Sequence, residues 1–363
     1  MRAWTKSRPA PGAEMATVPD PRPASNEVLI KVRRAGICGT DLHIYKWDPW
    51  AQRRIRPPLV FGHEMCGEIV ELGSEVRGRR VGEVVAVETH IMCGHCYLCR
   101  RNLGHVCEST KIIGVDRAGA YAEYIAIDAI NAWPVPEGMP LEHAVALEPL
   151  GNAVHTVMAG EIAGCSVAVT GCGPIGLFSI LVAKACGGGP VIATDINEYR
   201  LDLARACGAD VVVNAKQQDW VQAAREMTHG HGLDVVCEMS GVPAVIQQGL
   251  DALRNAGRMS LLGICAQDTT LDLDKLVIFK GITVQGIIGR RMFETWHQMT
   301  SLIGSGRLDI SQVITHVLPL ADLPQAMELL AAGKAAKIAM VPWGEAMPAA
   351  VPRAAQAAAG ARG

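Results

Sequence analysis

The sequence has no sustained run of basic residues, and its acidic and basic side chains nearly balance, giving a formal net charge of -2 at pH 7. Nucleic acids and anionic membranes attract concentrated positive charge, so neither is expected as the main partner. The first twenty residues also lack an apolar core of the secretory-signal type. The twelve cysteines are therefore expected in a reducing, cytoplasmic compartment, where metal binding is more common than disulfide formation.

One segment could be mistaken for a membrane span, because residues 162–183 carry no charge. Three glycines and Pro174 interrupt its middle, however, and this pattern predicts a buried strand, a turn and a buried helix. No membrane partner is expected. At 363 residues the chain is too long for one ordinary hydrophobic core, and we expect two domains.

The predicted pattern of secondary structure changes along the chain. Up to about residue 130 it contains short strand-like segments, at 27–32, 67–71 and 81–87, which predict a β-rich domain. From Ser166 onward strands and helices alternate, which predicts a doubly wound parallel sheet. We place the β-rich domain at 1–147, the parallel-sheet domain at 148–290 and a return to the first domain at 291–342. Residues 343–363, rich in Ala, Pro and Gly, are predicted to form a disordered tail.

A soft metal ligand, a hydroxyl and an imidazole lie within six positions, at Cys38, Thr40 and His43. Twenty residues later His63 and Glu64 offer a second imidazole and a carboxylate. A lone Cys or His is more often a buried structural residue. The combination of Cys, His and Glu with one position left open instead suits a catalytic zinc ion.

A second group of possible metal ligands consists of Cys93, Cys96, Cys99 and Cys107. Two CxxC steps followed by a further Cys can close a tetrahedron of thiolates around zinc, and no ligand position then stays open. The group is therefore expected to be structural. Two disulfides are the alternative, which a reducing compartment disfavours. His95 and His105 lie in the same loop and are expected to be bystanders.

A glycine-rich turn follows a predicted strand and opens a predicted helix, with Gly171, Gly173 and Gly176 in the GxGxxG spacing. Asp195 closes the next predicted strand. This context indicates a dinucleotide-binding site, in which glycines let the backbone approach a pyrophosphate at a helix N-terminus. Asp195 can bind both ribose hydroxyls and would repel a 2′-phosphate, so NAD is favoured over NADP. Arg200 keeps NADP open, because a nearby cation could accommodate that phosphate.

Together these motifs resemble those of the zinc-dependent medium-chain dehydrogenases, over residues 1–342. The segments that carry the resemblance are 38–43, 62–64, 148–155, 289–296, the four-Cys loop and the glycine-rich turn. Within this family the sequence is most similar to the L-threonine 3-dehydrogenases, since Thr40 stands where polyol dehydrogenases usually carry Ser. The resemblance implies an α/β fold in which a Rossmann doubly wound parallel sheet accompanies a β-rich, GroES-like catalytic domain.

The resemblance also implies roles for individual residues. Cys38, His63 and Glu64 would hold one catalytic zinc per chain beside Glu148, and the four clustered Cys would hold one structural zinc. Thr40 and His43 would relay the substrate proton. The NAD site would further include Ile175, Asp195, Arg200, Leu262, Gly263, Ile264, Ile287 and Ile288. The family's usual assembly implies a homotetramer.

The implied reaction oxidises the secondary alcohol of L-threonine, a small-molecule substrate, to 2-amino-3-oxobutanoate. A vicinal diol or polyol such as 2,3-butanediol or sorbitol is the alternative substrate. A non-catalytic nucleotide-binding protein is a third hypothesis, which the intact set of site residues disfavours. The substrate carboxylate would need a cation, for which four arginines are candidates: Arg54, Arg56, Arg290 and Arg291. Arg291 departs from the family pattern, which has Glu there.

Overall fold

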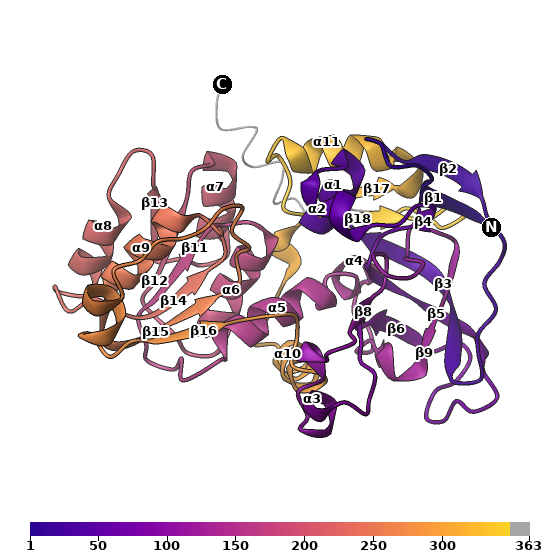
Figure 1. Cartoon of the computed structure of the whole chain (residues 1–363), viewed down its shortest axis with the longest axis horizontal. Helices are drawn as coiled ribbons and strands as arrows, with labels where there is room; N and C mark the ends of the chain where they lie inside the picture. Colours follow the sequence, from indigo (N-terminus) through magenta and orange to yellow (C-terminus); the bar gives the residue numbers. More distant parts are fainter. Residues whose placement is uncertain (349–363) are drawn as a thin grey trace. The chain divides into compact units, whose positions relative to one another are not determined.

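The computed structural model describes residues 1–348, which form two compact units (Figure 1). Of the described residues, the first unit contains 1–148 and 314–348, and the second contains 149–313. The boundary between residues 148 and 149 lies one position from the boundary predicted between 147 and 148. The return to the first unit comes at Ile314 and not at 291, because residues 291–313 make their contacts mainly within the second unit.

The main sheet of the first unit has seven strands within the described residues, in the order β10-β6-β5-β3-β18-β17, with β9 also paired to β3. Its strands are β3 (Glu27–Gly36), β5 (Glu64–Leu72), β6 (Val84–Val87), β9 (Tyr124–Asp128), β10 (Ala132–Pro134), β17 (Ile314–Pro319) and β18 (Lys337–Val341). Smaller sheets contain β1 (Arg2–Lys6), β2 (Glu14–Thr17) and β4 (Leu59–Val60), and β7 (His90–Ile91) with β8 (Lys111–Ile112). The predicted β-rich domain is confirmed.

Strand β3 organises this sheet and positions the residues that follow it. Its side chains alternate between buried and partly exposed positions, as a half-buried strand requires. Antiparallel pairing with β5 sets Gly36 opposite Glu64, so the chain just after β3 meets the chain just before β5. A side chain at position 36 would lie 2.2 Å from Glu64 Oε2, so this register needs glycine.

The helices of the first unit are short. They are α1 (Gly39–Lys46), α2 (Pro49–Arg54), α3 (Tyr97–Arg100), α4 (Leu141–Ala144) and α11 (Leu323–Ala331). Helix α5 (Leu147–Val157) begins in the first unit and continues into the second. The sequence pattern of residues 141–159 predicts a single helix, but the structure breaks this helix between α4 and α5. Pro149 explains the break: it fits the first turn of α5 but would clash with a carbonyl inside a continuous helix.

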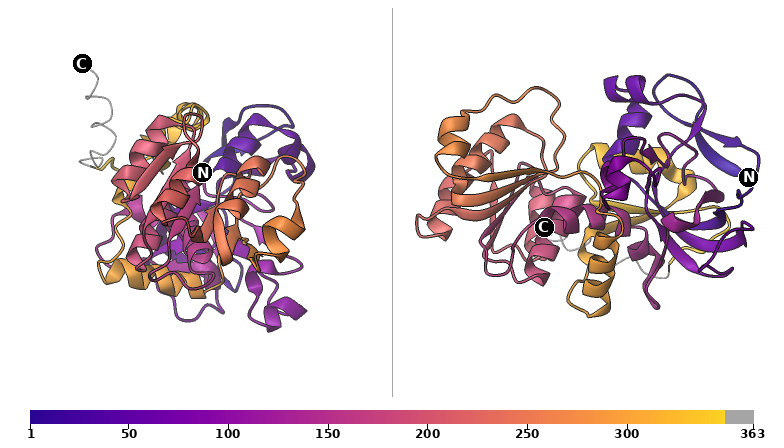
Figure 2. Two further views of the ribbon diagram at one scale, coloured as in Figure 1. Left: turned by 90° about the vertical axis from the view of Figure 1, so that its left-hand side faces the viewer. Right: turned by 60° about the horizontal axis from the view of Figure 1, so that its bottom comes forward.

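The second unit is built on a six-stranded sheet with the order β13-β12-β11-β14-β15-β16, in which all pairings are parallel. Its strands are β11 (Val167–Thr170), β12 (Val191–Asp195), β13 (Val211–Asn214), β14 (Leu233–Glu238), β15 (Leu253–Leu261) and β16 (Thr283–Gly286). Helices lie on both sides of the sheet (Figure 2): α6 (Pro174–Ala185), α7 (Glu198–Ala206), α8 (Trp220–Met227) and α9 (Pro243–Ala252). The unit also contains α10 (Glu294–Gly304). The predicted doubly wound fold is confirmed.

Short single-turn helices complete the two units: η1 (Gly104–Val106), η2 (Ala129–Asn131), η3 (Asp274–Ile278), η4 (Ser311–Val313) and η5 (Leu320–Asp322). The uncharged segment 162–183 contains strand β11, the glycine turn and most of α6, as predicted. None of the helices within residues 1–348 has the length and apolar character that crossing a membrane requires.

The start of the predicted tail is anchored to the first unit. Trp343 packs against the core, and the Glu345 carboxylate pairs with Lys31 at 2.9 Å and with Arg33 at 2.6 Å. Both partners lie on β3. The rest of the predicted tail, residues 349–363, lies outside the described residues.

Candidate active site

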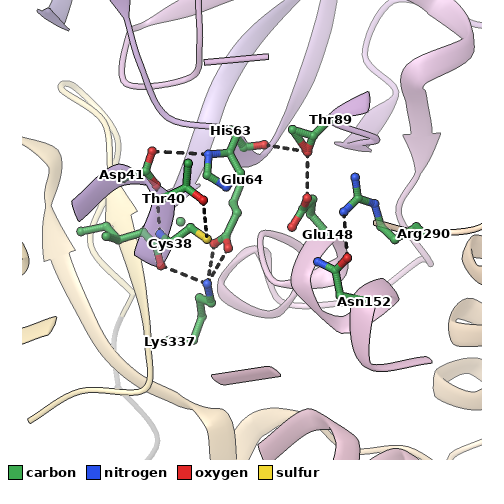
Figure 3. Close-up of polar contacts among 12 residues, drawn as sticks. Cys38, Thr40, Asp41, His63, Glu64, Thr89, Glu148, Asn152, Arg290 and Lys337 are labelled. Carbon is green, nitrogen blue, oxygen red and sulfur yellow. Dashed lines mark hydrogen bonds and ion pairs between the residues drawn. The ribbon is translucent and has the colours of Figure 1, made fainter. Parts of the chain in front are cut away.

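The three predicted ligands of the catalytic metal come together in the first unit (Figure 3). The ligand atoms of Cys38, His63 and Glu64 all lie within 4.8 Å of one another. Thr40 Oγ1 lies 3.9 Å from Cys38 Sγ. A thiolate, an imidazole and a carboxylate in this proximity form a donor set that fits zinc.

Asp41 organises this cluster and was missed from the sequence. Its Oδ2 accepts the backbone N–H of Cys38 at 2.9 Å and the hydroxyl of Tyr121, also at 2.9 Å. Its Oδ1 lies 3.4 Å from His63 Nδ1. A carboxylate behind a ligating histidine fixes the ring and leaves the other nitrogen, Nε2, for the metal. The signal was present, since Asp41 is the N3 residue of the capping box of α1.

The charges around His63 favour its protonated form in the metal-free site. Burial alone would lower the pKa of this imidazole, but the Asp41 carboxylate and the Cys38 sulfur raise it well above its ordinary value. Only a deprotonated imidazole nitrogen can bind a metal. Metal binding at this cluster must therefore release the proton.

Lys337 is a second organising residue that the sequence did not reveal. Its Nζ lies 2.6 Å from both Oε1 and Oε2 of Glu64 and donates to the carbonyl of Ile37 at 3.0 Å (Figure 3). Lys337 is 1% exposed and Glu64 is 0% exposed. Burial alone would lower the pKa of Lys337, but Glu64 and Cys38 raise it, so the ammonium group stays charged. Glu64 thus meets a fixed cation on one side and the metal cluster on the other.

Glu148, predicted beside the zinc, lies at the start of α5 and is buried. The hydroxyl of Thr89 donates to Glu148 Oε1 at 3.0 Å and lies 3.4 Å from the carbonyl oxygen of His63. Glu148 does not belong to the group of three clustered ligands. Thr89 instead links Glu148 to the backbone of His63. Glu148 is therefore a carboxylate beside the metal cluster and not a member of it.

Helix α1 presents Thr40 and His43 three positions apart, so they lie on one helix face. The His43 side chain is 57% exposed, and its Nδ1 forms a short contact with the carboxylate of Asp48. Asp48, which sequence analysis missed, also caps the start of α2. If Nδ1 carries the hydrogen of that contact, Nε2 is left to accept a proton.

Three of the candidate arginines already contact other side chains. Arg54 pairs with Asp116 at 2.6 Å and Arg291 pairs with Glu294 at 3.2 Å. Arg290 is buried and lies 3.5 Å from Asn152 Oδ1 (Figure 3). The pairs of Arg54 and Arg291 are exposed and therefore weak, so they do not prevent either arginine from binding a carboxylate.

The four clustered cysteines form a compact group, with all ligand atoms within 4.8 Å of one another. Backbone N–H groups point at the sulfurs, including Cys93 N–H to Cys107 Sγ at 3.3 Å. The N–H groups of Cys99 and Glu108 lower the pKa of Cys96 to about 6. All twelve cysteines, which lie within the described residues, are free thiols, so the disulfide alternative is not what the structure contains.

Replacing Cys93 by serine is expected to remove the proposed structural zinc without touching the Cys38 cluster. Metal analysis should find about half the zinc of the parent protein, and the melting temperature should fall by several degrees, since structural zinc contributes folding energy directly. His95→Ala is the matched control from the same loop. Equal zinc contents in the Cys93→Ser protein and the control would contradict the assignment.

The glycine-rich turn lies beside a cavity of about 380 Å³ in the second unit. Gly171, Gly173, Asp195 and Arg200 all line it. The Asp195 carboxylate accepts the N–H of Cys172 at 2.7 Å and lies 3.8 Å from an Arg200 nitrogen. A Cβ at position 176 would lie 2.0 Å from the carbonyl oxygen of Gly171, which explains the third glycine of the motif.

The other residues predicted for the coenzyme site do not line this cavity. Ile175 lies in the first turn of α6. The turn 262–264 follows β15 and leaves the Ile264 side chain 91% exposed. Ile287, which is buried, and Ile288, which is exposed, follow β16 at the neighbouring strand end. They therefore border the same edge of the sheet.

Comparison with known proteins identifies the family of the chain. Residues 24–137 match the alcohol dehydrogenase GroES-like domain, and residues 174–305 match the zinc-binding dehydrogenase domain. The L-threonine 3-dehydrogenase of Pyrococcus furiosus is 50% identical over 339 residues, which cover 93% of this chain and 97% of that protein. The chain belongs to the zinc-dependent medium-chain dehydrogenases. The Bacillus subtilis L-threonine 3-dehydrogenase is 48% identical to this dehydrogenase, over 94% of this chain and 99% of that protein.

Solved structures agree with the fold of this dehydrogenase. The alcohol dehydrogenase of Thermus sp. ATN1 superposes with a TM-score of 0.86 at 29% identity, covering 94% of this chain and 100% of that one. The 2R,3R-butanediol dehydrogenase of Bacillus subtilis gives a TM-score of 0.85, also at 29% identity, over 94% of this chain and 99% of that one. These structures support the architecture, while their identities are well below those of the threonine enzymes.

Proposed function

We propose that this dehydrogenase oxidises the secondary alcohol of L-threonine to 2-amino-3-oxobutanoate, with NAD as hydride acceptor. The observation that carries the proposal is the near 50% identity to several L-threonine 3-dehydrogenases over more than nine-tenths of the chain. The clustered Cys38, His63 and Glu64 support it. When bound, zinc supplies Lewis acidity toward the substrate hydroxyl and NAD supplies the hydride acceptor.

The ligand assignment rests on Cys38, His63 and Glu64, and each ligand has a partner that orients it. Asp41 holds Cys38 and His63, and Lys337 holds Glu64. Such outer contacts fix ring and carboxylate orientation before a metal arrives. Glu148, held by Thr89, is proposed as the nearby carboxylate that accepts a proton or exchanges with a ligand.

The proposed proton path starts at Thr40 and ends at His43. The Thr40 hydroxyl lies near Cys38 and can accept the substrate proton while passing its own onward. His43 is exposed, and Asp48 orients its ring, so His43 can pass the proton to solvent. The path needs two groups with different surroundings, one close to the metal cluster and the other in contact with water.

For the coenzyme, Asp195 at the end of β12 supports a preference for NAD. Its carboxylate borders the cavity beside the glycine turn, where it would accept hydrogen bonds from the ribose hydroxyls and repel a 2′-phosphate. Arg200 lines the same cavity. Its closest carboxylate is Asp195 itself, so the cation is partly neutralised where a phosphate would need it.

The test of the reaction is NADH production by the zinc-loaded enzyme with L-threonine, 2,3-butanediol and sorbitol at matched concentrations. We expect the highest kcat/KM with L-threonine. A higher value with 2,3-butanediol or sorbitol would favour the diol or polyol alternative. The proposed substrate would then be wrong, while the proposed zinc and NAD sites would stand. No turnover of any of the three by protein that retains zinc would contradict an alcohol dehydrogenase activity on these substrates.

We propose that the chain assembles as a homotetramer in the cytoplasm. Strand β16 is an edge strand, and beside it Phe279 is 81% exposed and Ile278 and Val284 are also exposed. An edge strand has unpaired backbone groups that can bind another strand, and exposed apolar side chains favour burial. A second copy of the chain can provide both. The free thiols suit a reducing compartment. Light scattering of the purified protein should give the mass of four chains, and a stable monomer would contradict the proposal.

A further inference from the structure

Glu238 is a buried carboxylate at the carboxyl end of β14, and neither the motifs nor the proposed mechanism uses it. Its side chain is 0% exposed. Its Oε1 accepts the N–H of Ser240 at 2.8 Å and of Gly241 at 3.1 Å, and the hydroxyls of Ser240 and Thr170 also lie within reach. Among residues 1–348 no Lys, Arg or His nitrogen pairs with this carboxylate. It is a buried acceptor surrounded by donors and without a cation.

Glu238 joins two turns at the end of the parallel sheet. Its carbonyl oxygen accepts the N–H of Leu262 at 3.0 Å and of Gly263 at 3.1 Å. A Cβ at position 263 would lie 2.6 Å from Glu238 Oε2, and one at 241 would lie 2.4 Å from the carbonyl oxygen of Ile264. The turn after β14 and the turn after β15 therefore pack backbone to backbone around this carboxylate.

The strand order places Glu238 on one particular half of the dinucleotide crevice. Strands β11 and β14 are neighbours at the point where the order of the sheet reverses, and a dinucleotide binds across that point. Asp195, the proposed ribose ligand, lies at the end of β12, so the adenosine half belongs to the β12 side. The nicotinamide half then belongs to the β14 and β15 side, where Glu238 lies.

We infer that Glu238 is a positioning residue of the coenzyme site whose negative charge favours the oxidised coenzyme over the reduced one. The inference rests on the proposed use of NAD. The oxidised nicotinamide ring carries a positive charge and the reduced ring is neutral. A buried charge without a partner is costly, and the arrival of a cationic ring nearby offsets part of that cost. The neutral ring of NADH gives no such compensation.

The hydrogen bonds accepted by Glu238 are enough to explain the shape of the two turns. They do not require a negative charge, so the absence of a paired cation points to a separate role for the charge of Glu238. Ser240 N–H and Gly241 N–H can only donate, so they require an acceptor at position 238. A glutamine would keep one acceptor oxygen while removing the charge. An aspartate would keep the charge while drawing the acceptor back by one methylene. These two substitutions therefore separate charge from position.

The test is calorimetric measurement of the dissociation constants of NAD+, NADH and ADP-ribose with the zinc-loaded, full-length protein. In Glu238→Gln the Kd of NAD+ should rise about tenfold more than the Kd of NADH, because only the oxidised ring loses an electrostatic partner. In Glu238→Asp both constants should rise by the same factor. ADP-ribose lacks the ring, so its Kd reports the cost of disturbing the turns alone.

Equal weakening of NAD+ and NADH in Glu238→Gln would overturn the charge role and leave a purely structural one. Glu238→Ala removes the charge without introducing an amide donor, and it gives the same comparison if the glutamine protein does not fold. Failure of the parent protein to bind either NAD+ or NADH would instead overturn the proposed coenzyme. The two proposals therefore fail in different ways.

Discussion

Cys38→Ser is expected to lower kcat by about three orders of magnitude or more, because the variant lacks the thiolate that binds the metal most strongly. Cys38 is the N-cap residue of α1, and its backbone N–H is held by Asp41. Serine can keep that backbone geometry, since it is itself a favourable N-cap residue. The loss should therefore come from the metal and not from misfolding.

Three measurements distinguish these causes in the Cys38→Ser protein. Metal analysis should show that one zinc is lost while the four-Cys site keeps its own. Calorimetry should give an unchanged Kd for NAD, because the glycine turn and Asp195 belong to the second unit. Cys165→Ser, outside both clusters, is the matched control and should retain activity. Full activity of Cys38→Ser would remove Cys38 from the proposed ligand set.

Lys337→Met is expected to destabilise the metal-free protein by about 3–5 kcal/mol, the usual cost of breaking a buried ion pair by removing one partner. Methionine preserves most of the volume but leaves the Glu64 carboxylate buried without its cation. Zinc offers a second positive partner, so the loss of stability should be smaller in the zinc-loaded protein than in the presence of a chelator. Urea unfolding of both forms measures the difference.

Two further variants test whether the effect of Lys337→Met comes from charge. Adding Glu64→Gln to Lys337→Met removes the stranded charge and should restore much of the lost stability. Lys337→Arg keeps the cation and should cost less than methionine, although the larger guanidinium must fit a fully packed position. Equal stabilities of the parent and Lys337→Met proteins, with and without zinc, would show that the pair contributes nothing to folding.

Local patterns in the sequence were sufficient to predict much of the architecture. The glycine turn was predicted because a strand, the GxGxxG spacing and an acidic residue at the next strand end all occur within residues 166–195. The four cysteines lie in one loop, so their spacing limits how far apart the sulfurs can be. In contrast, the break between α4 and α5 was missed although Pro149 signals it, and the late return of the chain at Ile314 has no local signal.

The partners of the ligands depended on contacts that sequence reasoning does not supply. Asp41 is close to Cys38 in sequence, yet its contacts with Tyr121 and His63 need β3 and β5 to be paired in one register. Lys337 meets Glu64 across 273 positions, because β18 pairs with the end of β3. No sequence motif links Asp41 to Tyr121 or His63, and none links Lys337 to Glu64.

By itself, the sequence determined which chemical groups this dehydrogenase has available: a set of zinc ligands, a four-thiolate loop and a nucleotide-binding turn. Each of these is encoded by residue types at short spacing, which the local chain geometry translates directly into proximity. The tertiary structure alone decided which charges are buried beside them, such as Lys337 against Glu64 and Glu238 at the sheet edge. Burial and long-range pairing depend on strand order and register, and these are fixed only when the whole sheet has formed.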